Sequence, residues 1–335
     1  AIASAFNLNG MSGVVRVVRH ALMGTFLLEG CGAILLATRF VPLFGWGRGL
    51  WYSIFHSVSA FCNAGFDILG REGHLYPSIV GYADNILVNG VIIGLIIIGG
   101  IGFLTWEDIC EYKWKFKSYR MQSKLILATT VCLIIFPACF FFFADFQHLP
   151  VKSRFLASVF QSVTPRTAGF NTVDITMMTE ASKVVMILLM LIGGSPGSTA
   201  GGMKTTTFAV LLLNAVATFK SQEHAGAFGR RIDDQVIKNA ASIAMLYFMM
   251  FLAGGIMIST AEGLPMLSSL FEAASAMGTV GLTLGITPSL HKISLYVLIL
   301  LMYMGRVGGL TLIYAVFSGK NKANARFPME KVMIG

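Results

Sequence analysis

Long apolar stretches separated by short polar segments run along most of the chain. Six of them are long enough to cross the hydrocarbon core of a bilayer, which is about 30 Å thick. They cover residues 20–41, 85–106, 124–146, 184–218, 236–260 and 292–317. Within each successive pair lies a shorter stretch that suits a helix of about 18 Å, enough for half a crossing. These shorter stretches are residues 49–61, 152–164 and 264–276. The pattern predicts three units, each made of a helix, a re-entrant segment and a second helix.

A short sequence motif recurs at the end of each half-crossing stretch. The first copy, FHSVSAFCNAGF, aligns without a gap with the third copy, FEAASAMGTVGL, and the middle copy, FQSVTPRTAGF, is one residue shorter. All three copies contain one glycine followed by a large apolar residue, at Gly65, Gly169 and Gly281. Spacings of about a hundred residues are those of a large repeated unit rather than of a solenoid.

The glycine segments have the properties of a cation site. Non-helical backbone is tolerated at membrane depth only where protein buries it or where it lines a watery cavity. The carbonyl end of each short helix would carry partial negative charge, and glycine can adopt the positive φ that turns carbonyls toward a common axis. No Asp or Glu lies in these segments, which favours a monovalent over a divalent cation. The alternative is that the glycines only break helices in tight turns.

The candidate filter residues are those at and just before each glycine, and a ring of their carbonyls would replace an ion's hydration shell. They are Cys62, Asn63, Ala64, Gly65, Thr167, Ala168, Gly169, Thr279, Val280 and Gly281.

Composition places the chain in a membrane. Hydrophobic residues make up 55% of it and charged residues 12%, with a mean hydropathy of +0.73, against about 25% charged residues in soluble domains. Fifteen of the 25 Lys and Arg residues fall before the first span, in the two connectors between units and in the tail. The net charge of +9 therefore follows the positive-inside rule and does not indicate nucleic-acid binding. We expect a multi-pass protein of the cell membrane, with the re-entrant segments opening from the extracellular face.

The fourth apolar stretch is too long for one straight helix, since its 35 residues would span about 52 Å. Glycine and proline crowd its middle and would free backbone groups there, which predicts a mobile loop below the filter. The candidate gate residues are Gly193, Gly194, Ser195, Pro196, Gly197, Ser198, Thr199, Ala200, Gly201 and Gly202. A static kink is the alternative. A nucleotide-binding P-loop is not indicated, because one residue too many separates the second glycine from the lysine.

A second repeat aligns GGIGFLT (99–105), GGMKTTT (201–207) and GRVGGLT (305–311), and places Arg306 where the other copies have glycine. An arginine in an apolar span costs about 3 kcal/mol on insertion scales. We expect Arg306 to set a positive charge beneath the filter and contact the gate loop, with a snorkelling structural arginine as the alternative. Lys204 either pairs across the cavity or reaches cytoplasmic water. Glu272 is expected to bind neighbouring backbone, and Arg166 to face away from the ion.

Three strings carry a resemblance to a known family: RFVPLFGWGRGLWYSIFHSVSAFCNAGFDILG (39–70), GGSPGSTAGGMKTTT (193–207) and MGRVGGLT (304–311). The chain resembles the Trk/Ktr/HKT superfamily of potassium transporters, and is most similar to the Ktr-type membrane subunit. The resemblance implies an all-α membrane protein in which four helix–pore-loop–helix units surround one pore. It also implies an intramembrane gating loop, an arginine at the Arg306 position, a homodimer, and a cytoplasmic ring of nucleotide-binding regulatory subunits.

Only three of the four implied units are visible. Residues 1–13 are expected to be a connector from an upstream unit. Residues 14–122, 123–235 and 236–317 form the second, third and fourth units, and residues 318–335 form a cytoplasmic tail.

The leading hypothesis is the ion-translocating subunit of a potassium uptake system, with K⁺ as the transported ion and Na⁺ as a second candidate. A secondary transporter of a small organic solute would also use discontinuous helices, but commonly in inverted repeats. A membrane enzyme would need a clustered nucleophile, acid–base pair or metal set. The six histidines form no HxxxH or HExxH pair and the five cysteines no CxxC, so enzymatic chemistry is not predicted.

Overall fold

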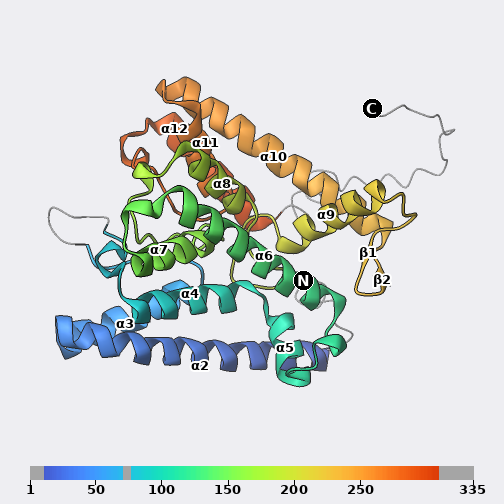
Figure 1. The fold of residues 1–335 in the computed structure, drawn as a ribbon, viewed down its shortest axis with the longest axis horizontal. Helices are drawn as coiled ribbons and strands as arrows, with labels where there is room; N and C mark the ends of the chain where they lie inside the picture. The colour runs from blue at the N-terminus through green and yellow to red at the C-terminus, as the bar shows by residue number, and fades with distance from the viewer. Residues whose placement is uncertain (1–10, 71–76, 309–335) are drawn as a thin grey trace.

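The computed structural model describes residues 11–70 and 77–308, and this part of the chain is mostly helical (Figure 1). The helices in the unit predicted at 14–122 are α2 (Met11–Phe44), α3 (Trp46–Phe61), α4 (Ile86–Gly100) and α5 (Phe103–Tyr112). Those in the unit predicted at 123–235 are α6 (Met121–Ala144), α7 (Val151–Val163), α8 (Glu180–Leu191) and α9 (Thr205–Phe219). Those in the unit predicted at 236–317 are α10 (Asp234–Glu262), α11 (Met266–Met277) and α12 (Lys292–Val307). The predicted connector at 1–13 and tail at 318–335 lie largely or wholly outside the described residues.

Short elements complete the described fold. Five 3₁₀ turns are η1 (Val80–Tyr82), η2 (Phe116–Ser118), η3 (Phe146–His148), η4 (Ile175–Met177) and η5 (Thr287–Ser289). An antiparallel hairpin pairs β1 (Gly226–Ala227) with β2 (Arg230–Arg231). The sequence pattern did not predict this hairpin, which lies in one of the basic connectors.

Three described helices are long and apolar enough to cross a membrane: Val18–Phe44 within α2, α6 and α10. These confirm the predicted spans at 20–41, 124–146 and 236–260. The short helices α3, α7 and α11 confirm that the three shorter stretches are helical. Each packs closely against the long helix that precedes it.

Two predicted spans differ from straight helices. The prediction of one helix over 85–106 was wrong, because α4 ends at Gly100 and α5 leaves at an angle of 98°. The bend is made at Gly102, whose φ of +89° is left-handed and strongly favours glycine. The stretch 184–218 forms two helices, α8 and α9, joined by residues 192–204. The last stretch is helical to Val307, and its remainder lies almost entirely outside the described residues.

The second repeat has a structural counterpart. Helices α5 and α9 begin at Phe103 and Thr205, which occupy the same position in the aligned strings. Gly308 corresponds to Gly102, and the two have nearly identical backbone angles, with φ of 88° and 89° and ψ of 142° and 146°. The backbone conformation at Gly102 is therefore repeated at Gly308, where α12 ends.

A carboxylate at the end of a long helix binds the N-terminal end of the inner helix of the same unit. Asp145, which follows α6, accepts hydrogen bonds from the Thr179 backbone N–H at 2.7 Å and from the Ser182 hydroxyl. Glu262, the last residue of α10, accepts from the His291 N–H at 2.8 Å and from the Ser294 hydroxyl at 2.5 Å. These contacts satisfy backbone groups that a helix N-terminus leaves free, and they fix where α8 and α12 begin.

The basic connectors lie at one end of the molecule. Figure 1 shows α5, the β1–β2 hairpin and the N-terminal end of α2 at the right, opposite the turns that lead into α3, α7 and α11. This arrangement agrees with the expectation of a single basic side. Part of the charge is neutralised locally, since Arg120 bonds Glu107 at 2.8 Å and lies 3.4 Å from buried Asp108. Burial lowers the pKa of Arg120, but these two carboxylates and Glu111 outweigh it and leave the pKa raised.

Buried apolar residues form two main clusters around the short helices. One surrounds α11 and includes Phe271, Met277, Met186 and Met190. The other surrounds α3 and α7 and includes Phe61 and Phe160. Large apolar side chains also cover the outside of the long helices, as at Phe26, which is 71% exposed, and Phe136, which is 72% exposed. An apolar exterior around a packed interior suits a lipid environment.

Candidate functional site

The three repeated glycines lie in loops that contact one another in series. Gly65, Gly169 and Gly281 have φ values of 69°, 83° and 91°. A Cβ added at Gly65 would overlap the carbonyl oxygen of Ala168, and one added at Gly169 would overlap the carbonyl oxygen of Val280. At Gly281 an added Cβ would meet no described atom within 4 Å. Glycine is therefore required twice over at the first two positions, by its φ and by the approach of a neighbouring carbonyl.

Each loop also contains a left-handed residue two positions before its glycine. Asn63, Thr167 and Thr279 have φ values of 49°, 66° and 52°. Asparagine tolerates this conformation, whereas it is unusual for β-branched threonine. Such strain persists only where the surroundings hold it. Apart from the alignment of the three copies, no feature of the sequence predicts this conformation.

A hydroxyl residue at one position of the repeated motif links the loop to its short helix by a hydrogen bond. The Ser59 hydroxyl donates to the carbonyl of Phe66 at 2.8 Å, and the Thr164 hydroxyl donates to that of Phe170 at 2.5 Å. In the third copy the Gly281 N–H donates to Ser275 Oγ at 3.1 Å. The backbone carbonyl of Ser59 also accepts from Ala64 N, as that of Ser275 does from Val280 N. The hydroxyl residues of the repeated motif thus hold each loop against its short helix.

Two side chains near the loops point toward outer helices. The Cys62 thiol lies 3.8 Å from Glu29 Oε1 on α2, and Cys62 itself caps α3. Buried Arg166 donates from Nη2 to the Thr130 hydroxyl on α6 at 3.3 Å. This contact agrees with the expectation that Arg166 faces away from an ion between the loops.

Residues 192–204 fold back on themselves between α8 and α9. Gly193 N donates to Met203 O at 2.8 Å and Gly194 N donates to Gly201 O at 3.3 Å. A Cβ at Gly193 would overlap Gly201 O, and one at Gly201 would overlap the Thr279 hydroxyl of the third loop. The small residues of this segment therefore allow it to pack directly against a glycine loop.

The same segment is bonded to the unit that contains α3, α4 and α5. Ser195 N donates to Gly100 O at 3.0 Å, and Phe103 N donates to Gly197 O at 3.0 Å. The Thr199 hydroxyl lies 3.0 Å from Phe61 O and 3.2 Å from Gly99 O, and it can donate its proton to either carbonyl oxygen. Asn63 Nδ2, from the first glycine loop, lies 3.4 Å from the same hydroxyl.

Two cationic side chains bind main-chain carbonyls of this segment. Arg306 on α12 donates from Nη1 to Thr199 O at 3.0 Å. Lys204 donates from Nζ to Ala200 O at 2.8 Å and is half-buried. The predicted contact of Arg306 with the segment is present. Neither prediction for Lys204 describes its observed bond, which is within its own loop.

Glu272 on α11 confirms the expectation that it binds neighbouring backbone. Its Oε1 accepts from Leu284 N at 3.0 Å, just outside the Gly281 loop.

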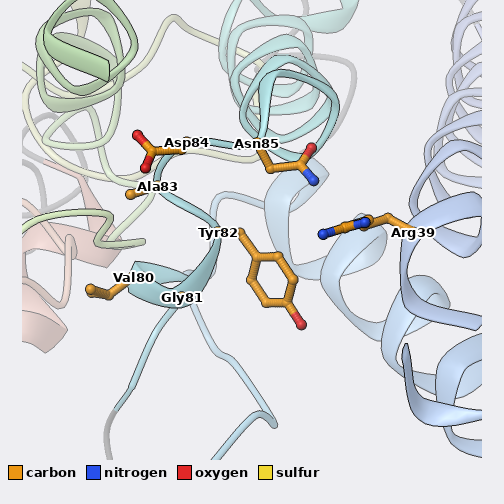
Figure 2. A pocket seen from close by; sticks show the side chains of 7 residues that line it. All are labelled: Arg39, Val80, Gly81, Tyr82, Ala83, Asp84 and Asn85. Carbon is orange, nitrogen blue, oxygen red and sulfur yellow. The ribbon is translucent and has the colours of Figure 1, made fainter. Parts of the chain in front are cut away.

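The structure also contains a cavity of about 270 Å³ between α2 and the start of α4. Figure 2 shows Arg39 reaching from α2 toward Tyr82 and Asn85 across it. None of its lining residues belongs to the glycine loops or to residues 192–204. The cavity is therefore separate from the candidate site.

Apolar helices long enough to cross a membrane, packed around three touching glycine loops, define a helical membrane protein. Residues 11–323 match the family of TrkH cation transport proteins, and the chain belongs to this family. This family match confirms the resemblance to the Trk/Ktr/HKT superfamily that was noted in the sequence.

Two relatives match the entire chain. It is 38% identical to the potassium/sodium uptake protein NtpJ of Enterococcus hirae and 35% identical to the Ktr system potassium uptake protein B of Bacillus subtilis. Each alignment covers 100% of the chain and 75% of the relative. The crystal structure of the potassium transporter TrkH from Vibrio parahaemolyticus superposes with a TM-score of 0.73 at 21% identity, over 92% of this chain and 66% of that one. This likeness shows the fold.

Proposed function

We propose that the chain is the ion-translocating membrane subunit of a potassium uptake system. The observation that carries the proposal is the serial contact of the three loops, in which the Ala168 and Val280 carbonyls reach the faces of Gly65 and Gly169. Loops this close present a row of main-chain oxygens that can replace the water around a K⁺ ion. The names of the two relatives support potassium, and that of NtpJ makes Na⁺ the second candidate.

The charge of the site favours a monovalent cation. Helices α3, α7 and α11 end at Phe61, Val163 and Met277, immediately before the loops. Their C-terminal ends contribute partial negative charge without a carboxylate. The proposed filter residues are the ten named from the sequence, from Cys62–Gly65, Thr167–Gly169 and Thr279–Gly281. Cys62 contributes through its main chain, because its side chain contacts α2.

The gate in this proposal is the segment Gly193–Gly202 together with Arg306. The segment packs against Thr279 and bonds Asn63, so it lies directly beside two of the loops. The Arg306 bond to Thr199 O holds it there and brings a positive charge to the same place. An ion leaving the loops would meet this segment, and its displacement would open the path.

The proposed assembly follows the resemblance of the sequence. Helix–pore-loop–helix units, four in all, would surround the pore, and the membrane subunit would be a homodimer in the cell membrane. A soluble ring of nucleotide-binding regulatory subunits would bind the cytoplasmic face. The basic connectors gathered at one end of the molecule support the assignment of that face.

Transport assays separate this proposal from the alternative of an organic-solute transporter. The full-length protein is expressed in cells that lack potassium uptake, and growth is followed at low potassium. In parallel, purified protein in liposomes is tested for uptake of ⁸⁶Rb⁺ as a potassium tracer and of labelled amino acids and sugars. Rescue of growth with ⁸⁶Rb⁺ uptake is expected. Uptake of an organic solute without ⁸⁶Rb⁺ would overturn the proposal.

A further inference from the structure

One position of the repeated motif, on the short helix before each glycine loop, is polar in all three copies. It directly follows the first aromatic residue and holds His56, Gln161 and Glu272. The three lie on α3, α7 and α11, and their exposed fractions are 0%, 0% and 4%. Burying a polar side chain is unfavourable unless it is hydrogen-bonded. The repetition of a buried polar group at one register position therefore requires an explanation.

In the third copy, the Glu272 carboxylate binds the segment that leaves the glycine loop. Oε1 accepts from the Thr283 hydroxyl at 2.6 Å and from Leu284 N at 3.0 Å, and Oε2 accepts from the Thr287 hydroxyl at 2.7 Å. Thr283 is two residues beyond Gly281. Since Ser275 on the same helix binds the Gly281 N–H, α11 holds the loop on both sides of the glycine.

The second copy makes the corresponding contact with neutral groups. Gln161 Nε2 donates to Asn171 Oδ1 at 3.1 Å, and Asn171 is two residues beyond Gly169, as Thr283 is beyond Gly281. The Asn171 main chain is fixed further, because its N–H donates to Ser78 Oγ at 2.8 Å and its carbonyl accepts from Ile79 N at 3.1 Å.

In the first copy the contact crosses to the next loop. The His56 ring bonds the Tyr52 carbonyl through Nδ1 at 2.7 Å, and its centre lies 6.4 Å from that of Phe170, which follows Gly169. Its Nε2 is buried and has no hydrogen-bond partner among the described residues. The first copy thus packs against a post-glycine segment where the others hydrogen-bond to one.

We propose that this position is a positioning site of the ion pathway, and that Glu272 is the positioning residue of the third loop. The inference rests on the proposed function. By tying α11 to residues 283–287, the Glu272 carboxylate prevents the Gly281 loop from widening or contracting, and so keeps its carbonyls at the spacing that suits one ion size. The Gln161 contact does the same for the second loop with an amide, so hydrogen bonding rather than negative charge is what the position supplies.

The test compares Glu272→Gln with Glu272→Leu in the full-length protein reconstituted in liposomes. The readouts are the KM for K⁺ and the ratio of K⁺ to Na⁺ uptake. Removing hydrogen bonds to a charged acceptor is expected to lower this ratio about tenfold in Glu272→Leu. The amide of Glu272→Gln keeps the acceptor for Thr283 and Leu284 and is expected to retain most of the ratio. Thr283→Val removes one donor without changing α11, and is expected to shift the ratio in the same direction by less.

The control is Glu262→Leu, which removes another hydrogen-bonded carboxylate of the same unit that does not contact the loop. It is expected to lower thermal stability and leave the uptake ratio unchanged. A wild-type ratio in both Glu272→Leu and Thr283→Val would overturn the inference, as would a ratio in Glu272→Gln as low as in Glu272→Leu. Absence of K⁺ uptake by the wild-type protein would instead overturn the proposed function.

Discussion

The close approach of the loops predicts a large effect of adding one methyl group at Gly169. Alanine there must keep a φ of +83°, which costs about 1–2 kcal/mol for a residue with a Cβ. The new Cβ would also overlap the Val280 carbonyl, and overpacking of this kind costs about 1–3 kcal/mol. We expect Gly169→Ala to be destabilised by about 2–5 kcal/mol in total, or to displace the third loop and lose preference for K⁺.

The matched control is Gly229→Ala in the β1–β2 hairpin. Gly229 has a similar φ of +73°, but an added Cβ meets no described atom within 4 Å. It therefore carries only the conformational cost of about 1–2 kcal/mol. Thermal unfolding in detergent and K⁺ and Na⁺ uptake in liposomes are measured for both variants. Equal stability and equal ion preference in the two would refute the argument that Gly169 is needed because a carbonyl approaches it.

Three further predictions concern the broken helix and the start of α8. Arg306→Ala removes a charged hydrogen bond to Thr199 O and is expected to raise ion leak more than about tenfold, measured as ⁸⁶Rb⁺ efflux from liposomes; unchanged flux and gating would remove Arg306 from the gate. Thr199→Val keeps the shape but loses the bonds to Phe61 and Gly99, so leak is expected to rise about fivefold, and a leak equal to wild type would show that the hydroxyl does not hold the segment. Asp145→Ala removes the acceptor for the Thr179 N–H and the Ser182 hydroxyl at the start of α8, and a loss of about 1 kcal/mol in stability with normal ion preference is expected; altered selectivity would contradict a purely structural role.

Much of the helical layout could be predicted because the signals are local. The short helices end close to where the repeated motif predicted, at Phe61, Val163 and Met277. The break in the fourth apolar stretch follows from its glycines and proline. The bend at Gly102 was missed because a single glycine in an apolar run is compatible with a continuous helix. Only its packing against Pro196 O, and the hydrogen bond from the next residue, Phe103 N, to Gly197 O, reveal the turn.

Most features of the candidate site that depend on distant contacts could not be predicted. The contact of Arg306 with residues 193–202 was expected from the sequence, but its partner atom, the Thr199 carbonyl oxygen 107 positions away, was not. The left-handed conformation of Thr167 and Thr279 runs against the preference of a β-branched residue, so local propensity predicts the wrong backbone. The Asp145 and Glu262 contacts were missed for a similar reason, since each partner lies about thirty residues further along the chain.

The position of Thr199 has a consequence for how the path would open. Its hydroxyl is shared between the ends of α3 and α4, while its carbonyl is held by α12. Any shift that lengthens one of these contacts strains the others. A partly displaced segment would lose hydrogen bonds on both sides while it still blocked the ion path. Partial openings therefore lie higher in free energy than either extreme, and single-molecule recordings should show abrupt transitions between two conductance levels with little time spent between them.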